Sequence, residues 1–230
     1  MVRVPVPGAD ADDAEAFEYV SEFITPEEEA YLLGKIDAAP KPKWKQLAHR
    51  RLQYYGGQIT ERSGALVAEP LPPFLTEFPA LVERIAATGV FAHSRHGAPN
   101  HCLVNEYLPR QGILPHTDGP AYYPAVATIS LGAPILLDVY ERTEHATPST
   151  PSFSLLQEPR SLLITHGAAY TRYLHGIAPR EHDTAADLAR VANRAALRDV
   201  SLCDAASLAR ERRVSLTFRD VERVAPRICR

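Results

Sequence analysis

Two histidines and an aspartate are the residues of this chain whose types and spacing could bind a metal ion. His116 and Asp118 stand two positions apart, and side chains so spaced on an extended strand point the same way, with Cα atoms ~6.6 Å apart. A third ligand must come from another strand, and His175 is well placed for it. Two imidazoles and one carboxylate leave one face of the ion open, as in non-haem iron(II) oxygenases.

The same residues have a simpler interpretation, as polar side chains in a surface turn, because a chain with 9 histidines can contain an H-x-D pair by chance. His166 competes with His175 as the third ligand, but the pair His166-Gly167 sits where a turn is expected. The other histidines are interpreted as surface or loop residues: His49, His93, His96, His101, His145 and His182.

A strand with one polar and one apolar face is predicted near the C-terminus, where Arg213, Ser215, Thr217 and Arg219 alternate with Val214, Leu216 and Phe218. A buried arginine is costly unless a carboxylate meets it, and a bound dicarboxylate would accept the two parallel hydrogen bonds that guanidinium offers. The alternative is a solvated face on which these arginines pair with nearby acidic residues. Upstream, Asn105 and Tyr107 share a strand face and offer an amide and a phenol to the same ligand.

These residues must be positioned by strands, and the sequence after about Pro99 has the pattern of a β-rich region. Short β-rich runs alternate with turns, which predicts an antiparallel sandwich or barrel. The runs are Cys102–Tyr107, Ala125–Leu131, Ile135–Tyr140, Ser161–Thr165, Tyr170–Ile177 and Val214–Val221. Thr143–Ser152, rich in Thr, Pro and Ser, is expected to be a mobile loop.

Two helices are predicted before this region. One runs from about Pro26 to Asp37, because Thr25 is a suitable N-cap and Glu28 completes a capping box. The other runs from Pro73 to Thr88, with Gly89 as its stop. The fold class is therefore expected to be mainly β with flanking helices.

Composition divides the chain into three parts. Residues 1–22 are acidic and are expected to form a disordered lead-in, residues 23–98 form a helical extension, and residues 99–223 form the β domain. An Ala- and Arg-rich segment at about 180–211 is interpreted as an insertion, with helical content around Asp183–Ala196.

Composition also excludes several classes. With 45% hydrophobic and 23% charged residues the chain is globular. No stretch approaches ~18 apolar residues, so no membrane span is expected, and Met1–Phe17 lacks the pattern of a signal peptide. The 3 scattered cysteines indicate neither a disulfide framework nor a zinc ribbon, so cytoplasm or nucleus is expected. A net charge of −3 argues against sequence-blind attraction of nucleic acid over the whole surface.

One local segment could still bind nucleic acid. Basic and aromatic residues gather there without an acidic one: Lys41, Lys43, Trp44, Lys45, Arg50 and Arg51, followed by Tyr54 and Tyr55. This mixture suits a lid that binds the nucleic-acid backbone and stacks on its bases. A solvated loop with Trp44 packed in the core explains it equally well. The candidate substrate residues are Arg50, Arg51, Tyr54 and Tyr55.

Taken in order, these motifs resemble the AlkB family of Fe(II)- and 2-oxoglutarate-dependent dioxygenases, and within it the group of the sixth eukaryotic homologue. The resemblance covers roughly residues 23–221. It rests on Asn105-x-Tyr107-x-Pro109, His116-x-Asp118, the run 127–132, His175-Gly176-Ile177 and Arg213-x5-Arg219, with the runs 50–57 and 115–124 most similar to that group. The resemblance implies a double-stranded β-helix, or jelly-roll, core.

By this resemblance, His116, Asp118 and His175 bind Fe(II), while Asn105, Tyr107, Arg213, Ser215 and Arg219 surround 2-oxoglutarate. With O2, such a site hydroxylates N-methyl groups of DNA or RNA and releases formaldehyde. Because six residues of extended strand span ~20 Å, Arg219 is expected to approach the cosubstrate of Arg213 only by folding back or through a bulge.

Two positions depart from the family's pattern. Gly119-Pro120-Ala121 follows Asp118 where nucleic-acid demethylases often carry acidic residues, and Ser215 stands in place of an asparagine. Three alternatives therefore stay open: a zinc-type hydrolase with the same ligands, an AlkB-like module that binds nucleic acid or protein with little turnover, and an oxygenase that acts on protein side chains. The sequence does not indicate the oligomeric state.

Overall fold

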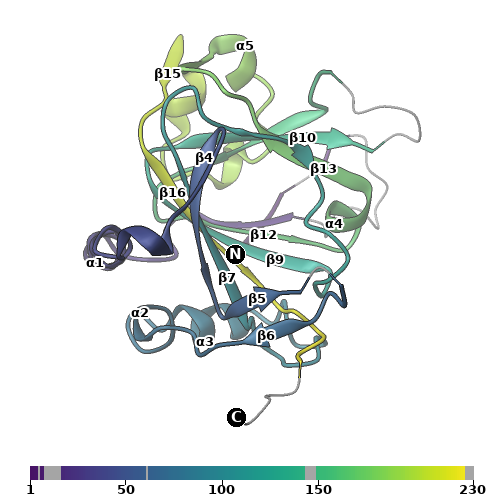
Figure 1. Cartoon of the computed structure of the whole chain (residues 1–230). Coiled ribbons are helices and arrows are strands. Elements are labelled where there is room, and N and C mark those ends of the chain that lie inside the picture. Colours follow the sequence, from purple (N-terminus) through teal and green to yellow (C-terminus); the bar gives the residue numbers. More distant parts are fainter. Residues whose placement is uncertain (5, 8–16, 61, 143–148, 226–230) are drawn as a thin grey trace.

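Two antiparallel sheets face each other in the computed structural model, which describes residues 1–4, 6–7, 17–60, 62–142 and 149–225 (Figure 1). The major sheet has eight strands, in spatial order β1 (Val2–Arg3), β2 (Phe17–Val20), β12 (Leu162–His166), β9 (Ala125–Gly132), β16 (Arg213–Arg219), β7 (His101–Tyr107), β4 (Arg50–Tyr55) and β3 (Lys45–Leu47). The minor sheet has four, β11 (Phe153–Gln157), β10 (Ile135–Glu141), β13 (Tyr173–Ile177) and β8 (Ile113–His116). The predicted jelly-roll architecture is confirmed.

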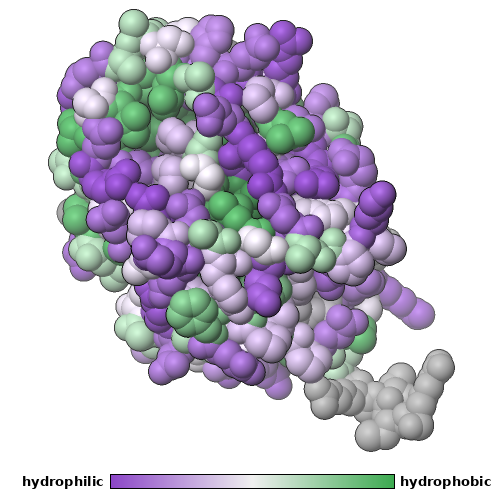
Figure 2. All heavy atoms as spheres, turned by 90° about the vertical axis from the view of Figure 1, so that its left-hand side faces the viewer, coloured by the Kyte–Doolittle hydropathy of each residue, from purple (hydrophilic) through white to green (hydrophobic). Residues whose placement is uncertain are grey.

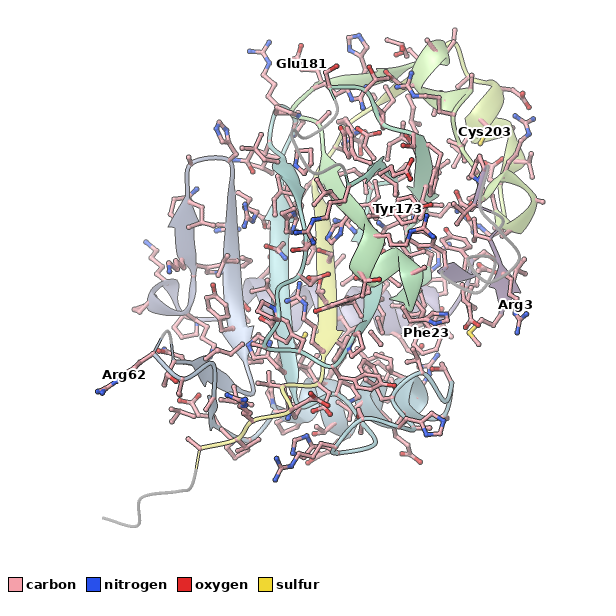
Figure 3. The ribbon with its side chains drawn as sticks, turned by 90° about the vertical axis from the view of Figure 1, so that its right-hand side faces the viewer. Arg3, Phe23, Arg62, Tyr173, Glu181 and Cys203 are labelled. Atoms are coloured by element: carbon pink, nitrogen blue, oxygen red, sulfur yellow. The ribbon has the colours of Figure 1, made fainter. Side chains whose placement is uncertain are left out.

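Strand β16 lies at the centre of the major sheet, between β9 and β7, with an uninterrupted register to both strands. Figure 3 shows β16 beside β7, with Tyr173 of the minor sheet near the middle of the molecule. Val214, Leu216 and Phe218 are fully buried against the helices on the outer face. Successive side chains of a strand point to opposite faces, so the polar positions of β16 face the space between the sheets.

Three helices cover the outer face of the major sheet, and a second set of short elements completes the fold. Helix α1 (Pro26–Asp37) is confirmed with the predicted capping box of Thr25 and Glu28, and Leu32 and Ile36 pack into the core. The single helix expected at 73–88 is wrong. The chain forms α2 (Pro73–Thr76) and α3 (Leu81–Ala86) instead, because Pro79 between them has no N–H to continue a helix.

The expected disorder of residues 1–22 is also wrong for those of these residues that the structure describes. Strand β2 pairs with β12, and β1 pairs with β2, so this segment forms an edge of the major sheet. Phe17 and Tyr19 are buried between the sheets. They alternate with the less buried Glu18 and Val20, which gives the period of a half-buried strand, although the segment as a whole is acidic in composition.

The extension and the insertion are likewise built onto the sheets. The hairpin β5 (Gly57–Ile59) and β6 (Leu66–Ala68) follows β4. The insertion is mostly turns, with a two-stranded sheet and short helical pieces: β14 (His182–Thr184), β15 (Ser207–Ala209), α5 (Ala185–Leu188), η3 (Arg194–Ala196) and η4 (Val200–Asp204). Arg180 holds it to the minor sheet, because its guanidinium binds Asp138 of β10 as well as Asp183 and Asp187.

Two other expectations are changed. The run 170–177 begins as helix α4 (Ala168–Arg172) before strand β13, and residues 143–148 of the expected mobile loop lie outside the described residues. The basic and aromatic segment at residues 41–55 is not one loop but contains η2 (Lys41–Lys43), β3 and β4.

Figure 2 shows a mostly hydrophilic face on the α1 side of the molecule. None of the helices in the described ranges has the length and hydrophobicity of a membrane span.

Candidate metal and cosubstrate site

The pairing of β8 with β13 brings the two candidate histidine ligands together. His116 and His175 are direct partners across the two strands, and their ring centroids lie 4.5 Å apart. Gly176 permits this close approach, because a Cβ there would lie 3.0 Å from the carbonyl oxygen of Ile113 and from the nitrogen of Pro115. The glycine after His175 is therefore a packing requirement of the site.

Asp118 follows β8 and completes the group. Its Oδ2 lies 3.8 Å from Nε2 of His175, and its Oδ1 accepts a hydrogen bond from the Arg219 guanidinium. Two donors bonded to one ion at ~2.0–2.2 Å cannot be more than ~4.4 Å apart, and the separation of Oδ2 from His175 satisfies this limit. The carboxylate thus offers one oxygen to Arg219 and the other toward the histidines.

Burial and the neighbouring cation set the protonation of these three groups. Burial raises the pKa of Asp118, but Arg219 and the two histidines outweigh it, so the pKa lies below its usual value. Burial lowers the pKa of His175 to about 4 and also lowers that of His116. Nδ1 of His116 lies 2.8 Å from the carbonyl oxygen of Leu114 and donates to it as a neutral ring, which leaves the Nε2 lone pair for a metal.

The donor set therefore fits a divalent transition metal: two neutral imidazoles and one anionic carboxylate. Among the described residues no group of three His, Cys, Asp or Glu side chains meets the criterion for a preformed metal site. Asp118 Oδ1 is paired with Arg219, and its Oδ2 is the oxygen that lies near His175.

Arg213 lies at the other end of the same polar face of β16. Its side chain is buried, with Nε donating to Ser130 Oγ at 3.0 Å and Nη2 to Gln157 Oε1 at 3.0 Å. Burial lowers its pKa to about 10, which is still far above neutrality. No ion pair joins Arg213 to a carboxylate in the parts of the chain that the structure describes. A buried cation held only by neutral groups calls for an anionic ligand.

The other predicted cosubstrate residues lie beside Arg213 or between the two arginines. Strand register sets Tyr107 opposite Arg213 and Asn105 opposite Ser215. All four line a cavity of about 260 Å³, together with the three candidate metal ligands and Arg219. The guanidinium of Arg213 also lies 5.7 Å from the centroid of the Tyr107 ring. The structure thus brings all eight predicted metal and cosubstrate residues to one cavity.

Arg219 reaches this cavity differently from the expectation. Strand β16 stays paired to β7 over its full length, without a fold-back or a bulge. The arginine contacts Asp118, the carboxylate among the candidate metal ligands, and stacks over the Tyr122 ring at 4.9 Å. Its pKa is raised, because Asp118 outweighs the effect of burial. Arg213 and Arg219 therefore lie at opposite ends of the polar face of β16, with Arg219 at the end of the candidate metal ligands, which is called the metal end below.

The four candidate substrate residues separate into two pairs. Arg50 and Tyr54 line the cavity, and Nε of Arg50 donates to Asn105 Oδ1 at 3.2 Å. Arg51 and Tyr55 point to the opposite side of β4, where Arg51 binds Glu106 and Tyr55 packs edge-on against Phe74. The strand alternation that separates them could have been applied to the sequence.

Several residues of the site were missed from the sequence. Ser130 and Gln157 hold Arg213 but carry no motif of their own. His101, expected at the surface, is buried at 1% exposure on the strand that carries Asn105 and Tyr107. Counting back by twos from Asn105 would have placed it on the same face. The preference for His175 over His166 agrees with the structure, since His166 is not among the residues that line the cavity.

A second, larger pocket of about 670 Å³ adjoins the metal end. Its lining comes from the extension, from the start of β7 and from the loop after β8: Pro42, Lys43, Lys45, Tyr54, residues 57–59, Glu69, His101 and residues 118–122. The hydroxyl of Tyr170 donates to the carbonyl oxygen of Gly119 at 2.7 Å. This bond fixes the loop that follows Asp118 and shapes the wall of the pocket.

Comparison with known proteins agrees with this geometry. Residues 35–219 match the model of the 2OG-Fe(II) oxygenase superfamily. The chain is 40% identical to "Probable RNA/DNA demethylase ALKBH6" of Danio rerio, over 90% of this chain and 86% of that protein. It is 32% identical to "tRNA (carboxymethyluridine(34)-5-O)-methyltransferase alkbh8" of Xenopus tropicalis, over 71% of this chain and 25% of that protein.

Solved structures show the same fold. The structure of OsALKBH1 matches with a TM-score of 0.58 at 15% identity, over 89% of this chain and 96% of that one. A Pseudomonas putida prolyl-4-hydroxylase matches with a TM-score of 0.50 at 13% identity, over 91% of this chain and 95% of that one. The superfamily match, the similarity to ALKBH6 and the shared fold show that the chain belongs to the AlkB family of Fe(II)- and 2-oxoglutarate-dependent dioxygenases.

Proposed function

We propose that this dioxygenase removes N-methyl groups from bases of single-stranded nucleic acid. Arg213 is the observation that carries the oxygenase chemistry to these residues. It is a buried cation with neutral hydrogen-bond partners, in the cavity that also holds the candidate metal ligands. A hydrolase with the same three ligands has no use for this cation, whereas the distal carboxylate of 2-oxoglutarate matches it.

Each residue of the cavity has a task in this proposal. His116, Asp118 and His175 hold the metal, and Arg219 orients Asp118 through its Oδ1. Arg213 holds the cosubstrate, and Asn105 and Tyr107 supply further hydrogen bonds beside it. The bound iron and 2-oxoglutarate supply the oxidising chemistry with O2, while the protein fixes geometry and keeps water away.

Two observations support nucleic acid as the substrate. The similar protein of Danio rerio carries the name "Probable RNA/DNA demethylase ALKBH6". Lys43 and Lys45 line the pocket beside the metal end, where they can meet phosphates, and Tyr54 and Tyr122 offer aromatic faces on which a base can stack. Extruding a base from a duplex costs a few kcal/mol, so a single strand is the preferred form.

Formaldehyde release from methylated strands tests the proposal. The purified chain, with Fe(II), 2-oxoglutarate and ascorbate, is given DNA, RNA and peptides that each carry one N-methyl group. The parent is expected to release formaldehyde and succinate together from a nucleic-acid strand. His116→Ala is expected to release neither, while the control His182→Ala, an exposed histidine of the insertion, matches the parent.

Other outcomes identify the alternatives. Formaldehyde from a methylated peptide and from no nucleic acid would make the chain a protein oxygenase. Strand binding without succinate would make it a binding module. An anaerobic Fe(II) and 2-oxoglutarate complex without a visible charge-transfer band would contradict the assigned cosubstrate site.

A further inference from the structure

The pocket beside the metal end, defined above by its volume of about 670 Å³, has one feature that the proposed chemistry does not use. His101 lines it from the start of β7 and is 1% exposed. Its Nδ1 is buried and has no hydrogen-bond partner within the described ranges. An unpaired buried polar atom typically costs 1–3 kcal/mol of stability, so native proteins rarely keep one without a reason.

Aromatic rings flank this imidazole. The ring centroid of His101 lies 6.1 Å from that of Tyr54 and 6.3 Å from that of Tyr122. Tyr54 is 38% exposed and lines the pocket. Burial lowers the pKa of His101 to about 4, and the nearby Arg219 adds to this effect. At neutral pH the ring is therefore uncharged and can form a hydrogen bond without presenting a charge.

The charges around the pocket favour a polyanionic strand over a cationic side chain. The charged lining residues within the described ranges are Lys43, Lys45, Glu69 and Asp118, and Asp118 is already paired with Arg219. The segment 119–121 adds only glycine, proline and alanine. A positively charged methylated base would gain little from such a lining, whereas phosphates would be attracted to the lysines.

We propose that His101 is a specificity-determining residue, whose Nδ1 hydrogen-bonds the edge of an uncharged N-methylated base that stacks on Tyr54 and Tyr122. The proposal rests on the function proposed above and names the class of base that this site selects. The hydrogen bond satisfies the buried nitrogen only when such a base is present. A site that leaves a buried polar group unpaired with the wrong ligand discriminates strongly against it.

Binding measurements on the full chain test this inference. The probes are single strands of one sequence that carry N6-methyladenine, which is uncharged, or 1-methyladenine, which is a cation, or no methyl group. Fluorescence anisotropy gives Kd in the presence of Mn(II) and 2-oxoglutarate. The parent is expected to bind the N6-methyladenine strand most tightly.

Substitutions of His101 separate hydrogen bonding from ring packing. His101→Phe keeps an aromatic ring and removes both nitrogens, and it is expected to raise the Kd of the N6-methyladenine strand about tenfold, as for one lost buried hydrogen bond. His101→Asn places an amide near Nδ1 and is expected to recover part of this loss, whereas His101→Gln places it near Nε2 and is not. The control His182→Phe alters an exposed histidine that lies outside the pocket and is expected to match the parent.

The failures of the two proposals are distinguishable. If the parent demethylates a strand but His101→Phe and His101→Asn bind it with the parent's Kd, the role of His101 is overturned while the proposed function stands. Tighter parental binding of the 1-methyladenine strand, or of a methylated lysine peptide, overturns the assigned base class. Equal affinities of the Asn and Gln variants overturn the Nδ1 assignment, and this comparison remains decisive if the Phe variant does not fold.

Discussion

At the scale of single residues, two arginines six positions apart on one strand serve different ends of the cavity. Arg219 pairs with Asp118, a candidate metal ligand, whereas Arg213 is held by a hydroxyl and an amide. The Asp118 carboxylate offsets the cost of burying Arg219, whereas the hydrogen-bond partners of Arg213 are neutral. Two arginines on the same face of one strand thus differ in how their burial is compensated.

Replacing Arg213 by methionine is expected to weaken 2-oxoglutarate binding without lowering the stability of the fold. The KM for 2-oxoglutarate is expected to rise about 100-fold, since a charge-assisted, two-bond contact is lost. The free energy of unfolding without ligand is expected to stay equal or increase, because a buried unpaired cation is removed. Steady-state kinetics and urea titration check the two effects, with the exposed Arg110→Met as control. A large loss of stability in urea would contradict the assignment.

His101 is expected to make the protein sensitive to mild acid. Its pKa falls from 6.5 to about 4 on folding, so the unfolded chain binds more protons between these values. The contribution to stability is complete above pH 6.5 and is lost as the pH falls toward 4, by up to about 3 kcal/mol. Urea titrations of the metal-free chain at a series of pH values should show this decline. In His101→Phe the decline should be smaller, and an unchanged profile would refute the burial of a neutral ring.

At the scale of elements, the close contact of β8 with β13 determines whether the two histidines can share an ion. Gly176→Ala would introduce a Cβ 3.0 Å from backbone atoms of β8, which must move the strands apart. Metal affinity is expected to fall at least tenfold, measured by titration with Mn(II). Gly34→Ala is the control, because it lies within α1 with nothing within 4 Å and should stabilise the chain by about 0.5–1 kcal/mol. Equal metal affinity of parent and Gly176→Ala would contradict this role.

Elements with a clear period could be predicted from the sequence, and those with mixed composition could not. Helix α1 carried its capping box, and β16 its alternation. Strand β2 has alternating burial but lies in an acidic segment, whereas β4 has the sequence RRLQYY, in which apolar and polar residues do not alternate. Ordered motifs indicated the candidate metal and cosubstrate residues, whereas His101 belongs to no motif and shares with Asn105 and Tyr107 only the alternation of one strand.

At the scale of the whole molecule, the cavity connects the two sheets. His116 and His175 belong to the minor sheet, whereas Arg213 and Arg219 belong to the major sheet. Mn(II) with 2-oxoglutarate at about 100 times Kd is expected to stabilise the fold by about 2.7 kcal/mol. This corresponds to a rise of roughly 5–10 °C in the thermal midpoint for a chain of this size. Removal by a chelator should reverse the shift, and Asp118→Ala should show none.

The uninterrupted pairing of β16 has a consequence for how such a gene can change. Deleting or inserting one codon between residues 213 and 219 would reverse the facing of the side chains beyond the change. The guanidinium group of Arg219 would then point toward the helix-covered core, and apolar side chains such as Phe218 would point into the cavity. Only length changes in steps of two preserve the facing, and even these displace one arginine from its end of the cavity. Lineages that keep the chemistry are therefore expected to vary in the surrounding loops and to hold this strand at constant length.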